Sequence, residues 1–234
     1  AAPAMGSFDG NWTGFYVGAD WGGKHFSASG DTTAAGGVSS AIAASEKTDR
    51  NANSILGGLH AGYNHQFGNG TVLGFEIDGG FTRARGEQAM PVSAFTQALQ
   101  AEYHQSYGAE TSGRVRLGQS FGRTLFYGTG GVGLVQEKQK RTQYRQIGSE
   151  TRPYFSETEE KIRPGMVLGG GLEFAFSDRL SLRTEYLFGY YPDKKFDFER
   201  ASQNIQGGAD VPIGREASNT LKTHSLRVGL NYHF

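Results

Sequence analysis

The side chains of this sequence best suited to acid–base or metal chemistry are six histidines: His25, His60, His65, His104, His224 and His233. No two of them stand two residues apart, the spacing that places both on one face of a strand. His25 and His224 could approach each other if the first and last strands of the chain were neighbours. With Ser27, Ser225 and the upstream acids Asp210 and Glu216, such a pair would offer the groups of a lipid-modifying enzyme. Proximity in sequence does not define a catalytic site, and we expect no catalytic residues.

The residue types of the chain give little indication of a metal or cofactor site. Cysteine is absent, which excludes disulfides, thiolate catalysis and cysteine-ligated metals. The histidines show no metal-ligand spacing, so we predict neither a metal site nor a cofactor. An exposed histidine or tyrosine can nevertheless ligate haem iron, and five candidates fall in or beside expected loops: Tyr103, His104, Tyr107, Tyr144 and Tyr154. A haemin-binding surface receptor is therefore an alternative.

The composition excludes one class of partner and favours one class of fold. Lysine and arginine number 23, aspartate and glutamate also number 23, and the pI is near 7.2. A chain with zero formal charge has no general attraction for a polyanion, so no nucleic-acid partner is expected. Glycine is frequent, with 36 residues, whereas proline is rare, with 6. Abundant glycine suits strands that crowd or curve and disfavours a helical bundle.

A period-two alternation of apolar and polar residues is the strongest structural pattern, and it is clearest at the C-terminus. One face of this segment carries Leu226, Val228, Leu230, Tyr232 and Phe234. The same template predicts eight strands, over residues 12–26, 54–67, 71–84, 106–120, 124–138, 163–177, 180–192 and 223–234. A mean hydropathy of −0.49 is compatible with membrane insertion of such strands, because lipid contacts only alternate positions.

The connections between these segments alternate in length. Short turns surround residues 68–70, 121–123 and 177–179, whereas long connections lie near 27–53, 85–105, 139–162 and 193–222. An even strand number, with tight turns on one side and long loops on the other, is typical of bacterial outer-membrane barrels. We therefore predict an all-β fold, an eight-stranded antiparallel transmembrane up-and-down β-barrel over residues 12–234. Residues 1–11 would form a short periplasmic N-terminal tail, and the long connections would be extracellular loops.

Four motifs carry a resemblance to a known family: Asn11–Gly18, Gly113–Gly118, Leu125–Gly133 and the C-terminal Leu230–Phe234. In these motifs the chain resembles the small eight-stranded outer-membrane proteins of alphaproteobacteria, the 25/31 kDa surface-antigen family. The resemblance implies a Gram-negative outer-membrane location and a structural or surface-interaction role; such families are linked to envelope integrity, adhesion and haemin binding. It also implies that the barrel assembly machinery recognises the C-terminal aromatic residue, with Leu230, Tyr232 and Phe234 as the assembly signal.

The inward faces of the predicted strands carry ten charged side chains: Asp20, Lys24, Glu76, Asp78, Arg114, Arg116, Glu173, Arg183, Glu185 and Arg227. The interior of an eight-stranded barrel is only just wide enough for its side chains, and an unpaired buried ion is very costly. We therefore expect a lumen charge network that plugs the barrel and holds its register. A narrow ion channel is the alternative.

The connection between the fifth and sixth predicted strands is rich in charge. Its basic half supplies the residues expected to contact lipopolysaccharide phosphates: Lys138, Lys140, Arg141 and Arg145. Outer-membrane lipids, lipopolysaccharide and the barrel assembly machinery are thus the expected partners, with other envelope proteins or peptidoglycan as further ones. The predicted function is non-enzymatic: a barrel in the bacterial outer membrane that contributes to envelope integrity and to surface interaction through its loops.

Overall fold

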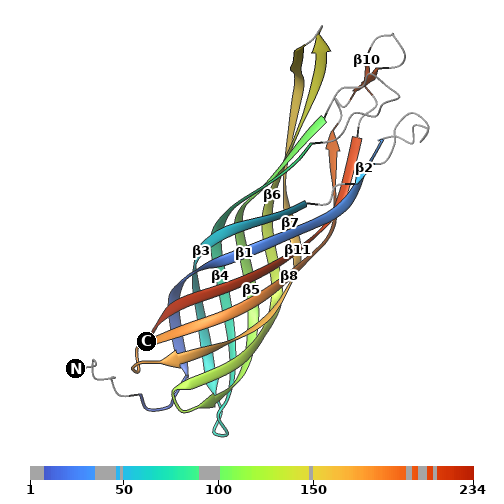
Figure 1. Cartoon of the computed structure of the whole chain (residues 1–234). Coiled ribbons are helices and arrows are strands. Elements are labelled where there is room, and N and C mark those ends of the chain that lie inside the picture. Colours follow the sequence, from blue (N-terminus) through green and yellow to red (C-terminus); the bar gives the residue numbers. More distant parts are fainter. Residues whose placement is uncertain are drawn as a thin grey trace.

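The computed structural model describes residues 8–34, 46–47, 50–89, 101–147, 150–198, 202–204, 210–212 and 215–234. Most of these residues form one closed sheet of long, tilted, antiparallel strands (Figure 1), and residues 202–204 and 210–212 form a separate two-stranded sheet. No helix in this part of the chain has the length and apolar character needed to cross a membrane. The wall is one sheet thick and surrounds a single lumen.

Eight long strands make up the wall: β1 (Gly14–Ala34), β3 (Arg50–Gln66), β4 (Thr71–Ala89), β5 (Ala101–Phe121), β6 (Thr124–Ile147), β7 (Glu150–Ala175), β8 (Leu180–Phe198) and β11 (Arg215–His233). Each pairs with the next along the chain, and β11 pairs with β1, which closes the ring. The described parts of the connections hold three short strands: β2 (Glu46–Lys47), β9 (Ser202–Asn204) and β10 (Asp210–Pro212). The predicted eight-stranded antiparallel barrel is confirmed.

The two ends of the barrel differ in their connections. At one end, called the turn end, residues 67–70, 122–123 and 176–179 join neighbouring strands. Gly70 and Gly122 have φ angles of 82° and 58° in these turns, a backbone conformation that residues with a Cβ rarely adopt. The other end, called the loop end, carries the remaining connections. The C-terminus lies at the turn end (Figure 1).

The segment before β1 folds against the turn end. The ring centres of Phe8 and Trp12 lie 5.2 Å apart in an edge-on contact, and the Asp9 amide donates to Oδ1 of Asp178 at 3.0 Å. Trp12 itself is buried. The short tail expected over residues 1–11 is therefore in contact with the barrel from Phe8 onward, and residues 1–7 lie outside the described part.

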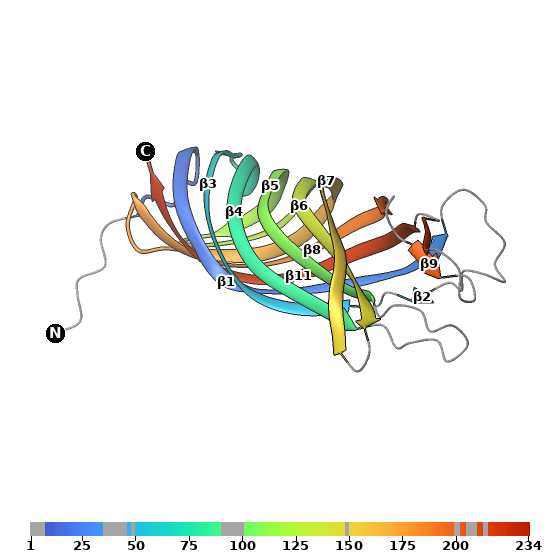
Figure 2. The ribbon, with the colours of Figure 1, turned by 90° about the horizontal axis from the view of Figure 1, so that it is seen from above.

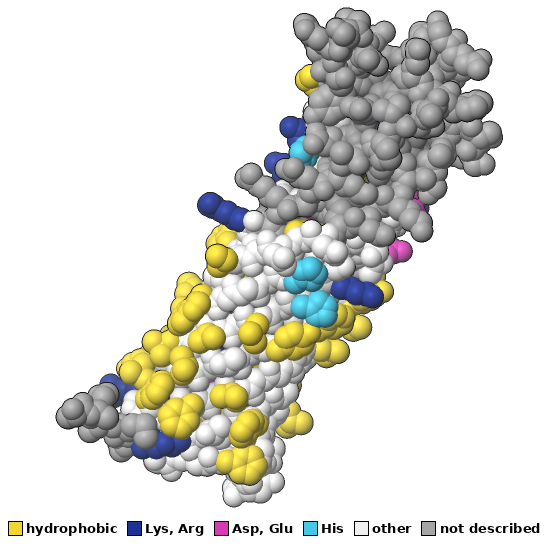
Figure 3. Space-filling model, in the orientation of Figure 1, with side chains coloured by type: hydrophobic (Ala, Val, Ile, Leu, Met, Phe, Trp, Pro, Cys, Tyr) yellow, Lys and Arg dark blue, Asp and Glu magenta, His cyan; other side chains and the backbone are white. Residues whose placement is uncertain are grey.

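Alternation along each strand sorts side chains between the lumen and the outer surface. Exposed large apolar residues lie on all eight wall strands, among them Ile55 (83 % exposed), Phe81 (75 %) and Val132 (67 %). On the face in Figure 3 these hydrophobic side chains cover the part of the barrel nearer the turn end. An apolar outer surface around a polar interior is the arrangement that a bilayer requires of a barrel.

The strands run further toward the loop end than the alternation predicts. β6 reaches Ile147 and β7 begins at Glu150, so most of the loop expected near 139–162 is a paired hairpin. The hydrophobic pattern stops where the outer face leaves the apolar zone, although backbone pairing continues. Residues of opposite charge stand opposite each other there, as Arg141 and Glu157 do, and such cross-strand pairs favour the hairpin.

Toward the loop end the wall separates between two strands. Pairing of β7 with β8 ends at Met166 and Tyr190, although both strands continue. The β6–β7 hairpin diverges from β8 beyond this point (Figure 2). A side chain of β7 bonds the backbone of β8 instead, because Nζ of Lys161 donates to the Lys195 carbonyl at 2.7 Å. The edge of β8 is thus partly covered.

The ladder is closed all the way round from the turn end to Met166 and Tyr190, and it predicts resistance to detergent, because this part offers no strand edge at which unfolding can begin. We expect the unheated protein to stay folded in SDS and to migrate differently from the boiled sample on a gel. Identical migration of the two samples, with a circular dichroism spectrum that lacks a strand signal, would contradict a closed barrel.

Candidate functional site

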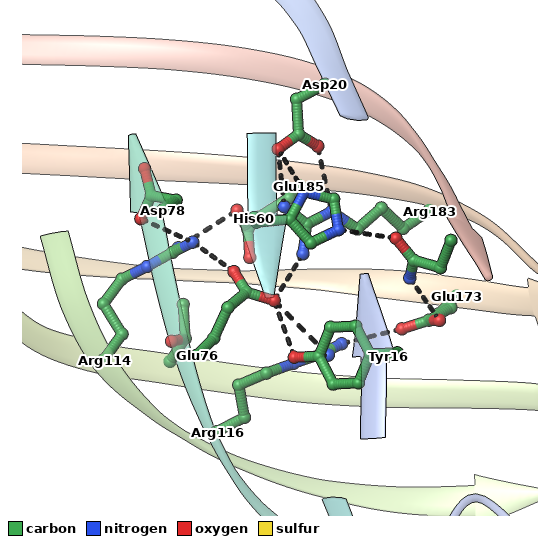
Figure 4. A network of polar contacts seen from close by, with 12 residues as sticks. Tyr16, Asp20, His60, Glu76, Asp78, Arg114, Arg116, Glu173, Arg183 and Glu185 are labelled. Carbon is green, nitrogen blue, oxygen red and sulfur yellow. Dashed lines mark hydrogen bonds and ion pairs between the residues drawn. The ribbon is translucent and has the colours of Figure 1, made fainter. Parts of the chain in front are cut away.

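The ten charged residues expected in the lumen all have buried side chains. Their exposed fractions lie between 0 % and 6 %. They come from β1, β4, β5, β7, β8 and β11, and eight of them are labelled in the close-up of Figure 4, where they point toward one another. Alternate positions of every strand face the same narrow space, which is why residues far apart in sequence meet there.

Glu76 on β4 is the centre of this cluster (Figure 4). Its Oε1 accepts from Nη2 of Arg114 at 2.5 Å, and its Oε2 accepts from Nη1 of Arg183 at 2.6 Å. The Tyr16 hydroxyl donates to Oε2 at 2.7 Å, and Nη1 of Arg116 lies 3.6 Å from the same oxygen. One carboxylate thus faces three guanidinium groups.

Further carboxylates balance the positive charge around Glu76. The guanidinium of Arg183 makes a bidentate contact with the Asp20 carboxylate. Nε donates to Oδ1 at 3.0 Å, and Nη2 donates to Oδ2 at 2.8 Å. Nη1 of Arg114 donates to Glu185 at 3.0 Å. Because β1 and β8 are not adjacent in the wall, the bidentate pair of Arg183 and Asp20 braces the barrel across its lumen.

Arg116 extends the cluster toward the turn end. Its Nη2 donates to Glu173 at 2.8 Å, and its Nη1 donates to the Tyr16 hydroxyl at 2.7 Å. Its guanidinium carbon lies 3.8 Å from the ring centre of Tyr127, within cation–π range. Neither tyrosine was predicted, because only charged side chains indicate an ion network, although the alternation places both tyrosines on the inward face.

Glu110 extends the cluster toward the loop end and was not predicted. It accepts from Nη2 of Arg227 at 3.0 Å and from Nζ of Lys24. Arg227 also donates to Asp78 at 3.1 Å. Because Glu110 lies four residues before Arg114 on β5, the alternation could have identified it as an inward acid. A register shift in the β5–β6 pairing lies just before it.

His60 adds an imidazole ring to this cluster. Its Nδ1 lies 2.8 Å from Oδ2 of Asp20, and its Nε2 lies 2.6 Å from Oδ1 of Asn231. Nδ2 of Asn231 donates to Glu173 at 2.5 Å, which turns the amide oxygen, rather than the nitrogen, toward His60. Both ring nitrogens of His60 therefore lie within hydrogen-bonding distance of side-chain oxygens. The ten predicted residues together with Glu110 and His60 are called the central network, in which six carboxylates face five lysine and arginine cations and one histidine.

Apolar side chains line the lumen on both sides of the central network. The layer nearer the turn end consists of Trp12, Val72, Leu125, Tyr127 and Ala175. The layer nearer the loop end consists of Phe26, Ala28, Ala52, Tyr107, Val135, Tyr191 and Leu221. In the second layer the rings of Phe26 and Tyr107 stack, with centres 4.3 Å apart and planes 11° apart. The charges thus lie between two apolar layers.

A small cavity lies between the central network and the second apolar layer. Its volume is about 20 Å³, and its lining includes Lys24, Asp78, Glu110, Tyr191 and Arg227. A space of this size holds about one water molecule. It is therefore suited to hydrating a charged group and is too small for a ligand.

A second polar cluster lies on the loop-end side of the second apolar layer. Nε of Arg163 is 2.9 Å from Oε2 of Glu137, and Nη1 of Arg163 donates to the Asn219 carbonyl at 3.1 Å. Closer to solvent, Nζ of Lys195 lies 2.9 Å from Oε1 of Glu216. The hydrogen bond to Glu216 raises the pKa of Lys195 above its ordinary value. The loop end is thus polar both inside and outside.

The four basic residues expected to contact lipopolysaccharide do not share one face. Lys138 and Lys140 are exposed on the outer face of β6. Arg141 is only 4 % exposed, so the expected outward contact was wrong for this residue. Odd-numbered residues of β6 from Leu125 to Arg141 face the lumen, which explains its burial. The side chain of Arg145 lies outside the described part of the structure.

His25 and His224 face each other across the β1–β11 seam, with ring centres 6.5 Å apart. Their Nδ1 atoms contact Asn53 and Tyr186 rather than an acid. Ser225 is buried and faces the lumen, on the other side of the wall from the histidines. The described residues therefore do not assemble the serine, histidine and acid of a hydrolase at this seam.

A serine meets a histidine and an acid elsewhere in the lumen. Oγ of Ser181 lies 2.9 Å from Nε2 of His233, and the same Nε2 lies 3.2 Å from Oε1 of Glu173. A catalytic relay needs the serine and the acid on opposite ring nitrogens. Because both contacts fall on one nitrogen, this trio does not have the geometry of a relay.

The residues considered for haem iron are separated in the structure. Tyr107 is buried in the second apolar layer, and His104 is half-buried. The side chains of Tyr103, Tyr144 and Tyr154 lie outside the described part. Within the described ranges, no group of three or more histidine and acidic side chains has the arrangement of a metal site.

The expected assembly signal lies on the outer face at the turn end. Leu230, Tyr232 and Phe234 are all exposed, and the rings of Tyr232 and Phe234 meet edge-on with centres 5.2 Å apart. The Phe234 amide donates to the Phe15 carbonyl at 3.1 Å. The last residue is thus held by the backbone of β1 while its ring projects outward.

Comparison with known proteins agrees with this geometry. The family model described as "Outer membrane protein beta-barrel domain" matches residues 1–234. The chain is 30 % identical over 230 residues to the 31 kDa outer-membrane immunogenic protein of Brucella melitensis, covering 96 % of this chain and 84 % of that protein. It is 27 % identical over 177 residues to the 25 kDa outer-membrane immunogenic protein of Brucella abortus, covering 76 % and 64 %.

Among solved structures, the outer membrane protein OprG from Pseudomonas aeruginosa is similar with a TM-score of 0.48 and 11 % identity, covering 98 % of this chain and 99 % of that one. The resemblance to the 25/31 kDa surface antigens is confirmed by the two Brucella relatives. The chain belongs to the family of outer membrane protein β-barrel domains, and its location is the bacterial outer membrane.

Proposed function

We propose that this barrel is a non-enzymatic, non-conducting component of the outer membrane that contributes to envelope integrity and presents its loop end to surface partners. The observation that carries the proposal is the occupied lumen, where the central network lies between two apolar layers. Small barrels filled by their own side chains have a structural interior rather than a transport path. The outer face and the loop end are then the surfaces available for interaction.

The loop end supplies a charged, projecting surface. The β6–β7 hairpin is built from the two longest strands, 24 and 26 residues, and it extends beyond the apolar zone. The named relatives are immunogenic outer-membrane proteins, which supports exposure of such a surface. Lipopolysaccharide is the partner whose phosphates suit the outward lysines of β6.

Lys138 and Lys140 provide a test of lipopolysaccharide contact. Changing both to glutamine should weaken binding by about 2 kcal/mol, or roughly 30-fold, at about 1 kcal/mol for each cation near an anionic surface. The measurement is the amount of lipopolysaccharide retained by the purified folded barrel during washes of rising ionic strength.

The matched control is Arg179→Gln, an exposed cation at the turn end. Arg179 lies at the opposite side of the membrane from the lysines, so its loss should leave retention unchanged. Equal retention by the wild type and the double lysine variant would remove this contact from the proposal.

A further inference from the structure

The outward-facing pair of His25, which is half-buried, and His224, which is exposed, plays no part in the proposed function. The two residues are direct partners in the β1–β11 register. Toward the turn end the next outward residue of β11 is the apolar Leu226, and toward the loop end it is Lys222. Figure 3 shows histidine side chains together just above the hydrophobic ones, on the face where β1 and β11 lie in Figure 1. The pair thus stands at the border between apolar and polar outer surface.

A hydrogen bond holds each ring at its Nδ1 atom. Nδ1–H of His25 donates to Oδ1 of Asn53 at 2.7 Å, because a carbonyl oxygen can only accept. A neutral His25 therefore presents a lone pair at Nε2. Nδ1 of His224 lies 2.7 Å from the Tyr186 hydroxyl, whose oxygen can accept a hydrogen bond from Nδ1–H in the same way. Within the described part of the chain, neither Nε2 atom has a hydrogen-bond partner.

We propose that His25 and His224 together bind one divalent transition-metal ion through their Nε2 atoms. Imidazole nitrogens suit Zn²⁺, Cu²⁺ and Ni²⁺. Two imidazoles that share a tetrahedral ion at about 2.0–2.1 Å have ring centres roughly 5 Å apart. The observed separation of 6.5 Å is longer, so binding requires rotations of the two side chains that bring the rings closer together.

The hydrogen bonds from Asn53 and Tyr186 support this assignment. Histidines that bind metals usually donate their other ring nitrogen to a neighbouring acceptor, which fixes the tautomer and the ring orientation. Both rings of the pair have such a partner. Water would complete the coordination, since the pair lies on the outer surface and supplies two protein ligands.

A phosphate group is the competing ligand for this surface, because the exposed Lys222 lies two residues from His224 on the same face. The two ligands make different demands on His25, whose Nδ1 is bonded to Asn53. A metal ion needs a lone pair at Nε2, whereas a phosphate needs a proton there. The two ligands also differ in their use of Lys222. An anion would depend on that ammonium group, whereas a metal cation would not.

The position of the pair gives metal binding a structural consequence. β1 and β11 are the first and last strands of the wall, and their pairing closes the barrel. An ion bound by one histidine from each strand would link β1 to β11 where the barrel closes. Because an ion that binds the folded form stabilises it, Zn²⁺ should raise the unfolding temperature of the wild type.

The test is calorimetric titration of Zn²⁺ into the full chain folded in detergent micelles, in buffer free of phosphate and chelators. We expect one ion per barrel, and loss of binding in His25→Gln and in His224→Gln at Zn²⁺ concentrations that saturate the wild type. Asn53→Ala should weaken binding by roughly 10-fold or more. With Cu²⁺, electron paramagnetic resonance should show two nitrogen ligands in the wild type.

Two variants serve as controls, and all variants must keep the heat-dependent gel mobility of a folded barrel. His65→Gln removes an exposed histidine at the turn end and should retain Zn²⁺ binding and its rise in unfolding temperature. Lys222→Gln should retain both as well. Zn²⁺ binding that survives loss of both His25 and His224 would overturn the proposal. Binding of inorganic phosphate that needs Lys222, without Zn²⁺ binding, would replace the metal with an anion.

Discussion

Arg183→Met is expected to destabilise the folded barrel by about 3–5 kcal/mol, the cost of leaving buried carboxylates without their partner. Arg183 lies 2.8 Å from Asp20 and 2.6 Å from Glu76, and all three side chains are buried. Methionine fills similar space but offers no charge, and the lumen hydrates the two acids poorly. Unfolding in urea, followed by tryptophan fluorescence in detergent micelles, measures the free energy of unfolding.

The matched control for this change is Arg179→Met, which removes an exposed arginine from a turn. Its effect should stay within about 0.5 kcal/mol. Asp20→Asn combined with Arg183→Met should cost less than the sum of the two single changes, because the residues are partners. The result would contradict a stabilising role of the buried ion pairs if Arg183→Met and Arg179→Met lowered the free energy of unfolding equally. Strict additivity of Asp20→Asn and Arg183→Met would contradict it as well.

Phe234→Ala is expected to lower the amount of folded barrel in the outer membrane severalfold, with little change in the stability of barrels that do assemble. The ring is 78 % exposed and contacts Tyr232, so its removal should change the free energy of unfolding by no more than about 0.5 kcal/mol. The larger effect follows if the barrel assembly machinery recognises this aromatic residue. The heat-modifiable band in isolated outer membranes measures the folded amount.

Phe121→Ala is the control for the loss of an outward aromatic ring. Phe121 is 64 % exposed near the turn end, yet it is far from the C-terminus in sequence, so assembly should be normal. If Phe234→Ala assembles as well as the wild type, the C-terminal residue has no role in assembly. If both variants fail equally, the effect belongs to the aromatic surface and not to a signal.

The barrel could be predicted because the residues of each strand alternate between apolar ones that face lipid and polar ones that face the lumen. The stripe from Leu226 to Phe234 needs no distant partner to be recognised, since lipid faces one side and the lumen the other. Antiparallel neighbours then follow from chain order. The facing of His25 and His224 across the closing seam is a consequence of that order.

The partners inside the lumen could be predicted only in part. Glu76 and Arg114 are opposite each other on adjacent strands, so their contact follows from pairing. Glu76 and Arg183 meet across the lumen, and their relative height depends on strand tilt and stagger, which the alternation does not specify. Tyr16 bonds Glu76 and Arg116, but its uncharged side chain gave no indication of this role in the sequence.

The loop end was the least predictable part. Beyond the apolar zone both faces of a strand carry polar residues, so the alternation of hydrophobicity disappears while backbone pairing continues. Arg141 illustrates the result, because a residue assigned to a solvated loop is an inward residue of β6. Its inward position could have been predicted only by continuing the inward–outward alternation of β6 beyond Val135, the last apolar residue of that pattern.

Recording ion currents through the folded full chain in a planar lipid bilayer tests the non-conducting lumen most directly. The central network between its two apolar layers predicts little or no steady conductance from the wild type at any voltage the bilayer withstands. A large porin inserted in the same bilayer shows that current can be detected. Large, stable and ion-selective currents from the wild-type barrel would contradict the proposal and would mean that the buried charges line a hydrated path.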